Sequence, residues 1–242
     1  MAVRGSCPVD SAQAPATGVP LPKGVRDMNV LLDNLDLFVT GFRNTLLLFV
    51  VSGFFALVLG TIVGAMRVSP VPAMRLFGTV YVNTVRNTPL TLILFFFAFG
   101  YPKLGLPEVS YTTLAIIGLS LYTATYVAEV LRSGVNTVPI GQAEAARAIG
   151  LPFGQTMTLV ILPQAFRAVL PPLFSVLIAL LKNTTVAAGF SVAEAGAIRA
   201  NLSERGEPLL IGLLWVALIF VALVSLLSLA QRAFEKKWRI AR

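Results

Sequence analysis

Long runs of apolar residues, separated by short polar segments, make up the chain after its first 35 residues. The clearest run is residues 44–66, 23 residues without a charge between Arg43 and Arg67. About 20 apolar residues suffice to cross the ~30 Å hydrocarbon core of a bilayer. We therefore expect five transmembrane helices, at about 44–66, 76–100, 111–131, 157–181 and 208–230.

Two of these runs carry helix-breaking or polar residues at membrane depth. Arg86-Asn87-Thr88-Pro89 interrupts the second run, and such a break is tolerated only against protein or a water-filled cavity. The fourth run contains Pro163, Pro171 and Pro172, which predict a kinked or broken helix.

A pair of small residues, Gly60 and Gly64, lies four positions apart in the first run. This spacing can let a second helix approach closely. It is equally consistent with glycines that only reduce side-chain bulk in a helix crowded with large residues.

The composition excludes a soluble domain. The 242 residues have a mean hydropathy of +0.81, and 12% of them are charged, against roughly 25% in soluble proteins. Histidine is absent and Cys7 is the only cysteine, so His-based metal sites, catalytic triads and a disulfide framework are excluded. The Pro-, Ala- and Ser-rich residues 1–35 are expected to be a mobile polar segment, with a candidate interfacial helix near 30–38.

The 19 Lys and Arg residues are scattered between apolar runs, which argues against nucleic-acid binding. Five crossings place the termini on opposite sides of the membrane. With the N-terminus outside, ten basic residues fall in cytoplasmic segments and eight in exterior ones. Because basic residues near helix ends are enriched in the cytoplasm, the basic tail and the 67–86 segment favour a cytoplasmic C-terminus.

A short helix is expected at about 140–149, between the third and fourth spans. Pro139 can begin it, and Gly150 can end it in the left-handed conformation. Its alanine-rich surface fits a groove on another protein, with Ala145 and Ala146 in close contact and Glu144 as a charged anchor. From the residues alone, an interfacial helix lying on the membrane is an equally good interpretation.

Four motifs resemble those of permease subunits of ATP-binding-cassette (ABC) importers, in particular the polar amino-acid uptake family. Glu144-Ala145-Ala146, Gly150 and Ile161-Leu162-Pro163 resemble its EAA signature. Arg86-Asn87-Thr88-Pro89 is similar to its R-G-T-P segment, with Asn87 where glycine is usual. A third segment, with Tyr126, Ala128, Glu129, Arg132 and Gly134, resembles the family's Y-x-A-E-x-x-R-x-G motif. The fourth, Lys182-Asn183-Thr184-Thr185, resembles its K-(N/D)-(T/S)-S motif, with Thr185 in the serine position.

The resemblance, which covers about residues 38–238, implies an all-α integral membrane domain (36–242) with the type I ABC importer permease fold. It implies a bacterial inner-membrane protein with its N-terminus outside, paired with a second permease subunit, identical or not. It also implies two cytoplasmic ATPases, an extracytoplasmic solute-binding protein, and a coupling helix whose Glu144, Ala145, Ala146 and Gly150 sit in an ATPase cleft. The chain has no G-x-x-x-x-G-K-[ST] motif, so ATP and Mg²⁺ are expected on the partner ATPase, with no cofactor and no enzymatic activity in this chain.

Polar groups at membrane depth are the candidates for the substrate path. Glu129, the only acid inside a predicted span, is expected to accept the ammonium group of an amino acid. Alternatively, Glu129 pairs with Arg132 or with a basic residue of another helix. The full set is Arg86, Asn87, Thr88, Tyr126, Glu129, Lys182, Asn183 and Thr184, with Arg86–Thr88 or Lys182 and Asn183 as donors to the carboxylate.

Glutamate or glutamine is the expected substrate. Three other classes fit less well. An ion-coupled secondary transporter would usually show more crossings and an internal repeat. A channel subunit leaves the EAA spacing unexplained, and a membrane enzyme lacks an evident nucleophile and base.

Overall fold

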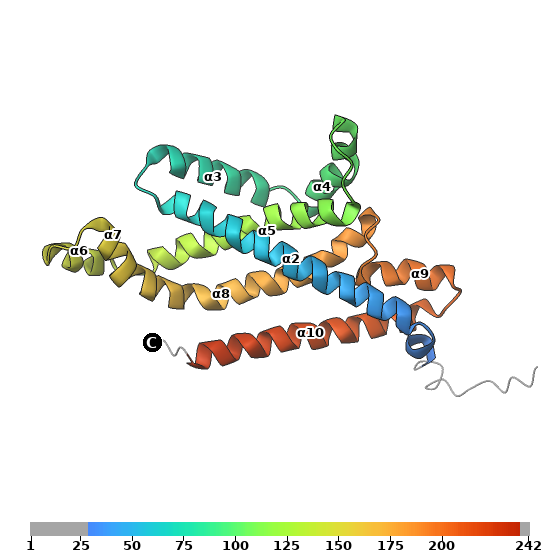
Figure 1. The fold of residues 1–242 in the computed structure, drawn as a ribbon. Helices are drawn as coiled ribbons and strands as arrows, with labels where there is room; N and C mark the ends of the chain where they lie inside the picture. Colours follow the sequence, from blue (N-terminus) through green and yellow to red (C-terminus); the bar gives the residue numbers. More distant parts are fainter. Residues whose placement is uncertain (1–28, 238–242) are drawn as a thin grey trace, which may run out of the picture.

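The computed structural model describes residues 29–237, a range that is helical and contains no strand. Its long helices are α2 (Leu35–Val68), α5 (Tyr111–Asn136), α8 (Leu162–Asn183) and α10 (Leu209–Lys237), which run roughly along one direction (Figure 1). The shorter elements are α3 (Pro72–Arg86), α4 (Leu90–Phe95), η1 (Phe96–Gly100), η2 (Tyr101–Leu104), α6 (Ile140–Ala148), α7 (Phe153–Gln155), η3 (Thr156–Ile161), η4 (Thr184–Phe190), η5 (Ala195–Ala197) and α9 (Ile198–Glu204).

Four helical segments of the described chain are long and apolar enough to cross a membrane: Leu35–Val68, Tyr111–Asn136, Phe153–Phe190 and Leu209–Lys236. A fifth candidate is the pair Pro72–Arg86 and Leu90–Leu104, which is bent by 95° at its break. The expected five crossings are obtained when this pair counts as one span. The bend lies where the Asn87-Thr88-Pro89 sequence predicts an interruption.

Helical structure begins at residue 29, where a short helix near 30–38 was expected, and it continues into the first predicted span. Residues 29–33 are already helical and α2 begins at Leu35, so the end of the expected mobile segment 1–35 is part of the fold; residues 1–28 lie outside the described residues. Val30 is buried in a cluster with Phe38. Arg205 holds the turn between the two helical stretches, because its Nη1 donates to Asn34 Oδ1 at 2.8 Å.

The prolines of the fourth span predicted a helix that is kinked or broken, and the structure shows that it is not broken. Helical structure continues from Phe153 to Phe190, with Pro171 and Pro172 inside α8. Pro163 is the second residue of α8, which directly follows the π-helical η3. Wider π-helical turns accommodate departures from the regular i→i−4 hydrogen-bond pattern, so the helix passes this proline without an interruption.

The glycine pair of α2 marks its closest contact with α5. A Cβ atom built on Gly60 would lie 2.5 Å from Val127 Cβ and 2.8 Å from the carbonyl oxygen of Ala124. At Gly64 the nearest atom would be Leu131 Cβ, at 3.2 Å. The interpretation of these glycines as a close-approach site is therefore confirmed.

A buried acid ties α2 to the segment between η4 and η5. Glu194 is 1% exposed, and its Oε2 accepts a hydrogen bond from Thr45 Oγ1 at 3.2 Å. Its Oε1 accepts from the Gly196 amide at 2.8 Å, and Asn44 Nδ2 donates to the Ala193 carbonyl at 2.6 Å. These bonds fix the connection that precedes α9.

Burial raises the pKa of Glu194, since its hydrogen bonds offset desolvation only in part. A raised pKa means that the stability contributed by this group is present below the unfolded value of 4.5 and is lost as pH rises through the folded pKa. We expect Glu194→Gln to gain stability relative to wild type as pH rises from 5 to 8. Thermal unfolding of the detergent-purified protein checks this; a difference in Tm that does not change with pH would contradict it.

Candidate functional site

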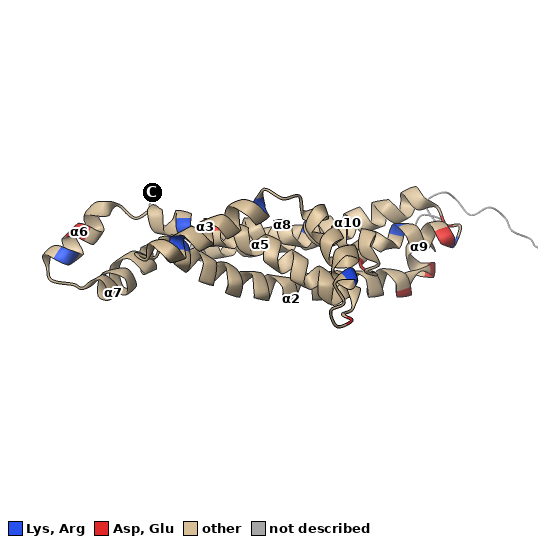
Figure 2. Ribbon diagram, turned by 90° about the horizontal axis from the view of Figure 1, so that it is seen from above, with Lys and Arg blue, Asp and Glu red and all other residues tan. Residues whose placement is uncertain are grey.

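The short helix α6 projects beyond the bundle at the end where α10 also ends (Figure 1). Seen from above, α6 carries both acidic and basic residues (Figure 2). Much of the middle of the bundle is uncharged in the same view. Its bounds, Ile140–Ala148, match the helix predicted at about 140–149. The sequence pattern therefore gave the position of this helix to within one residue.

Gly150 ends α6 in the way that its sequence predicts. Its φ of +88° lies in the left-handed region. The Gly150 amide donates to the Arg147 carbonyl at 2.9 Å, and the Leu151 amide donates to the Ala146 carbonyl at 3.1 Å. This pair of bonds is a Schellman motif, which satisfies carbonyl groups left open at the helix end and reverses the chain.

The EAA residues divide between two faces of α6. Glu144 and Ala145 are exposed, and so is Gly150, but Ala146 is only 4% exposed and helps α6 to pack against η3. The close contact that we expected Ala146 to make with another protein is thus taken by this chain itself. The reason is geometric, because a helix that folds back onto its own continuation must bury one of its faces.

Two large apolar side chains on α6 and its C-terminal cap, which were not predicted as functional, are exposed. Ile140 is 76% exposed and Ile149 is 78% exposed, at opposite ends of the helix. Large apolar groups at a helix surface are typical anchors for a hydrophobic groove. The sequence does contain a feature that could have indicated them, because an isoleucine lies at each end of this polar, alanine-rich helix.

A cluster of four charged residues lies where α2, α3 and α5 meet. Glu129 on α5 is ion-paired with Arg67 on α2, and its Oε1 lies 2.5 Å from Nη2 of Arg132. Nη1 of Arg86, at the end of α3, lies 4.0 Å from Glu129 Oε2. This arrangement corresponds to the alternative in which Glu129 pairs with basic residues. Both of its oxygens are engaged, so an ammonium group would have to compete with guanidinium groups.

A cavity of about 410 Å³, lined by both polar and apolar side chains, opens between α5 and α8. Tyr126 and Asn183 both line it, and the Tyr126 hydroxyl is 2.8 Å from the hydroxyl of Tyr122. The Arg86 guanidinium lies over the Tyr126 ring, 5.6 Å from its centroid. Tyr126 therefore contacts one predicted path residue, Arg86, and shares a cavity with another, Asn183.

The remaining candidates lie elsewhere. Lys182 lines a different cavity of about 350 Å³, against α10, and Thr184 is fully buried with its hydroxyl donating to the Leu181 carbonyl at 2.8 Å. Asn87 caps α3, and the Thr88 hydroxyl donates to the Thr84 carbonyl at 2.8 Å. These residues shape the backbone around the break and the end of α8.

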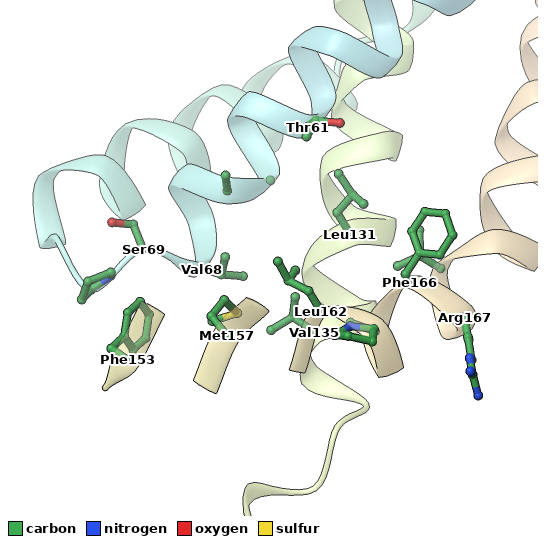
Figure 3. Close-up of a pocket in the computed structure, with 16 residues that line it drawn as sticks. Thr61, Val68, Ser69, Leu131, Val135, Phe153, Met157, Leu162, Phe166 and Arg167 are labelled. Atoms are coloured by element: carbon green, nitrogen blue, oxygen red, sulfur yellow. The ribbon is translucent and has the colours of Figure 1, made fainter. Parts of the chain in front are cut away.

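A larger, mostly apolar cavity of about 790 Å³ lies between the end of α2, α5 and the start of the fourth span. Figure 3 shows Val68, Leu131, Met157 and Leu162 among the side chains that line it. No local sequence pattern indicates this cavity, because its walls come from three separate helices.

Replacing Glu129 with glutamine is expected to destabilise the bundle, because three guanidinium groups then lose their counter-charge. We expect a cost of about 2 kcal/mol, below the 3–5 kcal/mol of a fully buried pair, since Arg86 and Arg132 are partly exposed. Thermal unfolding in detergent measures it. Arg67→Gln in the same background should restore part of the loss, and Glu204→Gln at an exposed acid should change nothing. Unchanged stability of Glu129→Gln would contradict a structural role.

A bundle with four helical segments long and apolar enough to cross a membrane, and a bent pair that can form a fifth, has the architecture of a multi-pass membrane protein. The chain belongs to the family of binding-protein-dependent transport system inner membrane components, whose family model matches residues 56–240. This confirms the resemblance to permease subunits of ABC importers.

Relatives and solved structures agree with this family. The chain is 44% identical over 210 residues to the glutamate transport system permease protein GluC of Corynebacterium glutamicum, covering 80% of this chain and 92% of the relative. It is 34% identical over 215 residues to the probable glutamine ABC transporter permease protein GlnM of Bacillus subtilis, covering 87% and 97%. The crystal structure of an amino acid ABC transporter with histidines matches with a TM-score of 0.82 at 25% identity, covering 86% and 97%. The expected type I importer permease fold is confirmed.

Proposed function

We propose that this chain is the subunit through which an ATP-driven importer moves a polar amino acid, glutamate or glutamine, across the bacterial cell membrane. Two glutamate permease relatives, at 44% and 48% identity, support the first substrate, and a probable glutamine permease at 34% supports the second. An extracytoplasmic binding protein delivers the amino acid. The N-terminus lies outside and the C-terminus in the cytoplasm.

The observation that carries this proposal is the capped helix α6. ATP and Mg²⁺ are bound by partner ATPase subunits, and this chain holds no cofactor. Glu144, Ala145 and Gly150, together with the exposed Ile140 and Ile149, form the surface that enters the ATPase. Closure of the ATPase pair moves α6, and α6 moves the fourth span through its contact with η3.

The substrate crosses next to the break between α3 and α4. A broken backbone at membrane depth requires protein or water beside it. Tyr126 and Asn183 line the cavity between α5 and α8, and the Arg86 guanidinium lies over the Tyr126 ring, 5.6 Å from its centroid. A second permease subunit, identical or related, completes the path.

Co-purification from bacterial membranes tests this proposal. A tagged chain is expected to carry with it an ATPase and a second permease, and the complex in proteoliposomes should show ATP hydrolysis stimulated by a binding protein loaded with glutamate or glutamine. An inactivating substitution in the ATP site of the partner is the control and should stop uptake. Uptake that continues without ATP hydrolysis would favour an ion-coupled secondary transporter or a channel.

A further inference from the structure

Arg167, in the second turn of α8, has no counter-charge in the described chain. It forms no ion pair with any carboxylate of residues 29–237, and its side chain is exposed. It lies at the edge of the apolar cavity of about 790 Å³ and extends away from Leu131 and Leu162, which line that cavity (Figure 3). A charged side chain near the end of a membrane-spanning segment extends to the membrane surface, where it can meet an anion.

The cavity beside Arg167 suits an apolar occupant. Only three of its 16 lining residues, Thr61, Ser69 and Arg167, have polar side chains. Leu162 and Phe166 line it and are exposed, so the cavity is open at the surface of the described chain. Because the atoms that line an unfilled apolar space lose van der Waals contacts, a flexible hydrocarbon chain in this space would restore them.

The end of α10 lies beside α8 on the same side as Arg167. The ring centroids of Phe174 on α8 and Phe234 on α10 are 5.5 Å apart. Arg167 precedes Phe174 by seven residues, a spacing that places both on one face of the helix. Since the two helices run antiparallel, the last residues of α10 extend from Phe234 in the direction in which Arg167 lies (Figure 1). Arg232 and Lys236 are exposed at this end of α10.

The sequence at the end of α10 is strongly basic. Residues 232–242 contain five Lys or Arg residues and one acid. The acid, Glu235, accepts a hydrogen bond from Gln231 Nε2 at 2.9 Å and forms no ion pair within residues 29–237. Trp238 follows, and tryptophan is enriched at membrane–water interfaces. Basic residues of two adjacent helices therefore lie at one end of the bundle, next to an apolar cavity.

We propose that an anionic phospholipid binds at this place, with its head group at Arg167 and the basic end of α10 and one acyl chain in the apolar cavity. This inference rests on the proposed function, which places the C-terminus, and hence this end of the bundle, at the cytoplasmic leaflet. Basic pockets between transmembrane helices on the cytoplasmic side bind anionic head groups, and each Lys or Arg near an anionic membrane surface contributes about fivefold in affinity. A soluble phosphate would match the charge but leave the cavity empty.

Lipid binding to the complete complex, purified in detergent with its ATPase and second permease subunit, tests this inference. Native mass spectrometry compares phosphatidylglycerol with phosphatidylcholine of the same acyl chains. We expect phosphatidylglycerol to bind at least about tenfold more tightly, and Arg167→Gln to lower its affinity at least about fivefold. Arg167→Lys keeps the charge and should retain most of the binding. Arg75→Gln, at an exposed arginine of α3 that does not line the cavity, is the matched control and should bind as wild type does.

The apolar part of the site needs a variant of its own. Ala65 on α2 is exposed and lines the cavity, so Ala65→Phe fills cavity space without entering the core. We expect this variant to lose phosphatidylglycerol binding although Arg167 is intact, and unchanged binding would overturn the placement of the acyl chain. A large excess of glycerol phosphate should not displace the lipid. Displacement would show that the phosphate alone is recognised, which would also overturn the inference.

Equal affinity for the two lipids, or unchanged phosphatidylglycerol binding by Arg167→Gln, would overturn the inference. The comparison of the two lipids uses the wild-type complex, so it decides even where a variant does not fold. Neither result would affect the proposed function. That function is contradicted instead by a complex that shows no ATP-driven amino-acid uptake, whichever lipid it binds.

Discussion

Replacing Gly150 with valine is expected to abolish ATP-dependent amino-acid uptake while leaving the protein inserted in the membrane and paired with its partner subunit. Gly150 has a φ of +88°, a conformation that a β-branched residue adopts only at a cost of about 1–2 kcal/mol or more. The Schellman bonds to Arg147 and Ala146 would be lost, and α6 would leave its position on η3. Uptake and stimulated ATP hydrolysis in proteoliposomes measure the effect.

Gly150→Asn is the matched control for this prediction. Asparagine is the residue that most often replaces glycine at left-handed helix ends, so this variant should keep a large part of the uptake. Apart from the two chain neighbours, no residue would have an atom within 4 Å of a Cβ atom at this position, so the two variants differ in backbone conformation and not in space. Uptake by the valine variant at the wild-type rate would refute the coupling role of α6, and equal loss in both variants would refute its conformational cause.

Gly60→Ala is expected to give the second large effect, a loss of folded permease. The new Cβ would meet Val127 Cβ at 2.5 Å and the Ala124 carbonyl at 2.8 Å, and neither atom is the end of a flexible side chain. Overpacking of this kind costs about 1–3 kcal/mol. A lower yield of monodisperse protein and a lower Tm in detergent are the measurements.

The same substitution at Gly53 serves as the control. Gly53 is also on α2, but its added Cβ would meet Leu180 Cδ2 at 3.5 Å, an ordinary van der Waals distance. We expect Gly53→Ala to have a Tm near that of wild type. If both alanine variants unfold at the same temperature, the contact between α2 and α5 is less tight than these distances indicate.

The features that sequence predicted best are those with local causes. The length of an apolar run in the sequence predicts where a membrane-spanning helix lies. Accordingly, α5 and α10 begin within one residue of the predicted starts at 111 and 208. A proline followed eleven residues later by a glycine delimits α6, and the left-handed Gly150 needs only local backbone geometry. The break at Asn87-Thr88-Pro89 was equally visible, because polar residues and proline interrupt an apolar run.

Contacts between helices could not be predicted in the same way. Glu129 and Arg67 are 62 residues apart, and their pairing depends on how α2 and α5 are rotated about their axes. The burial of Ala146 depends on α6 folding back onto η3, which no local pattern specifies. Lys182 and Asn183 are adjacent in sequence but line different cavities, because successive residues of a helix point about 100° apart.

The π-helical turn η3 has a mechanical consequence for the fourth span. A π turn holds about one residue more than an α turn, and such turns are frequent at functional sites. Because η3 lies between α6 and α8, a displacement of α6 that travels along the chain to α8 passes through this wider turn.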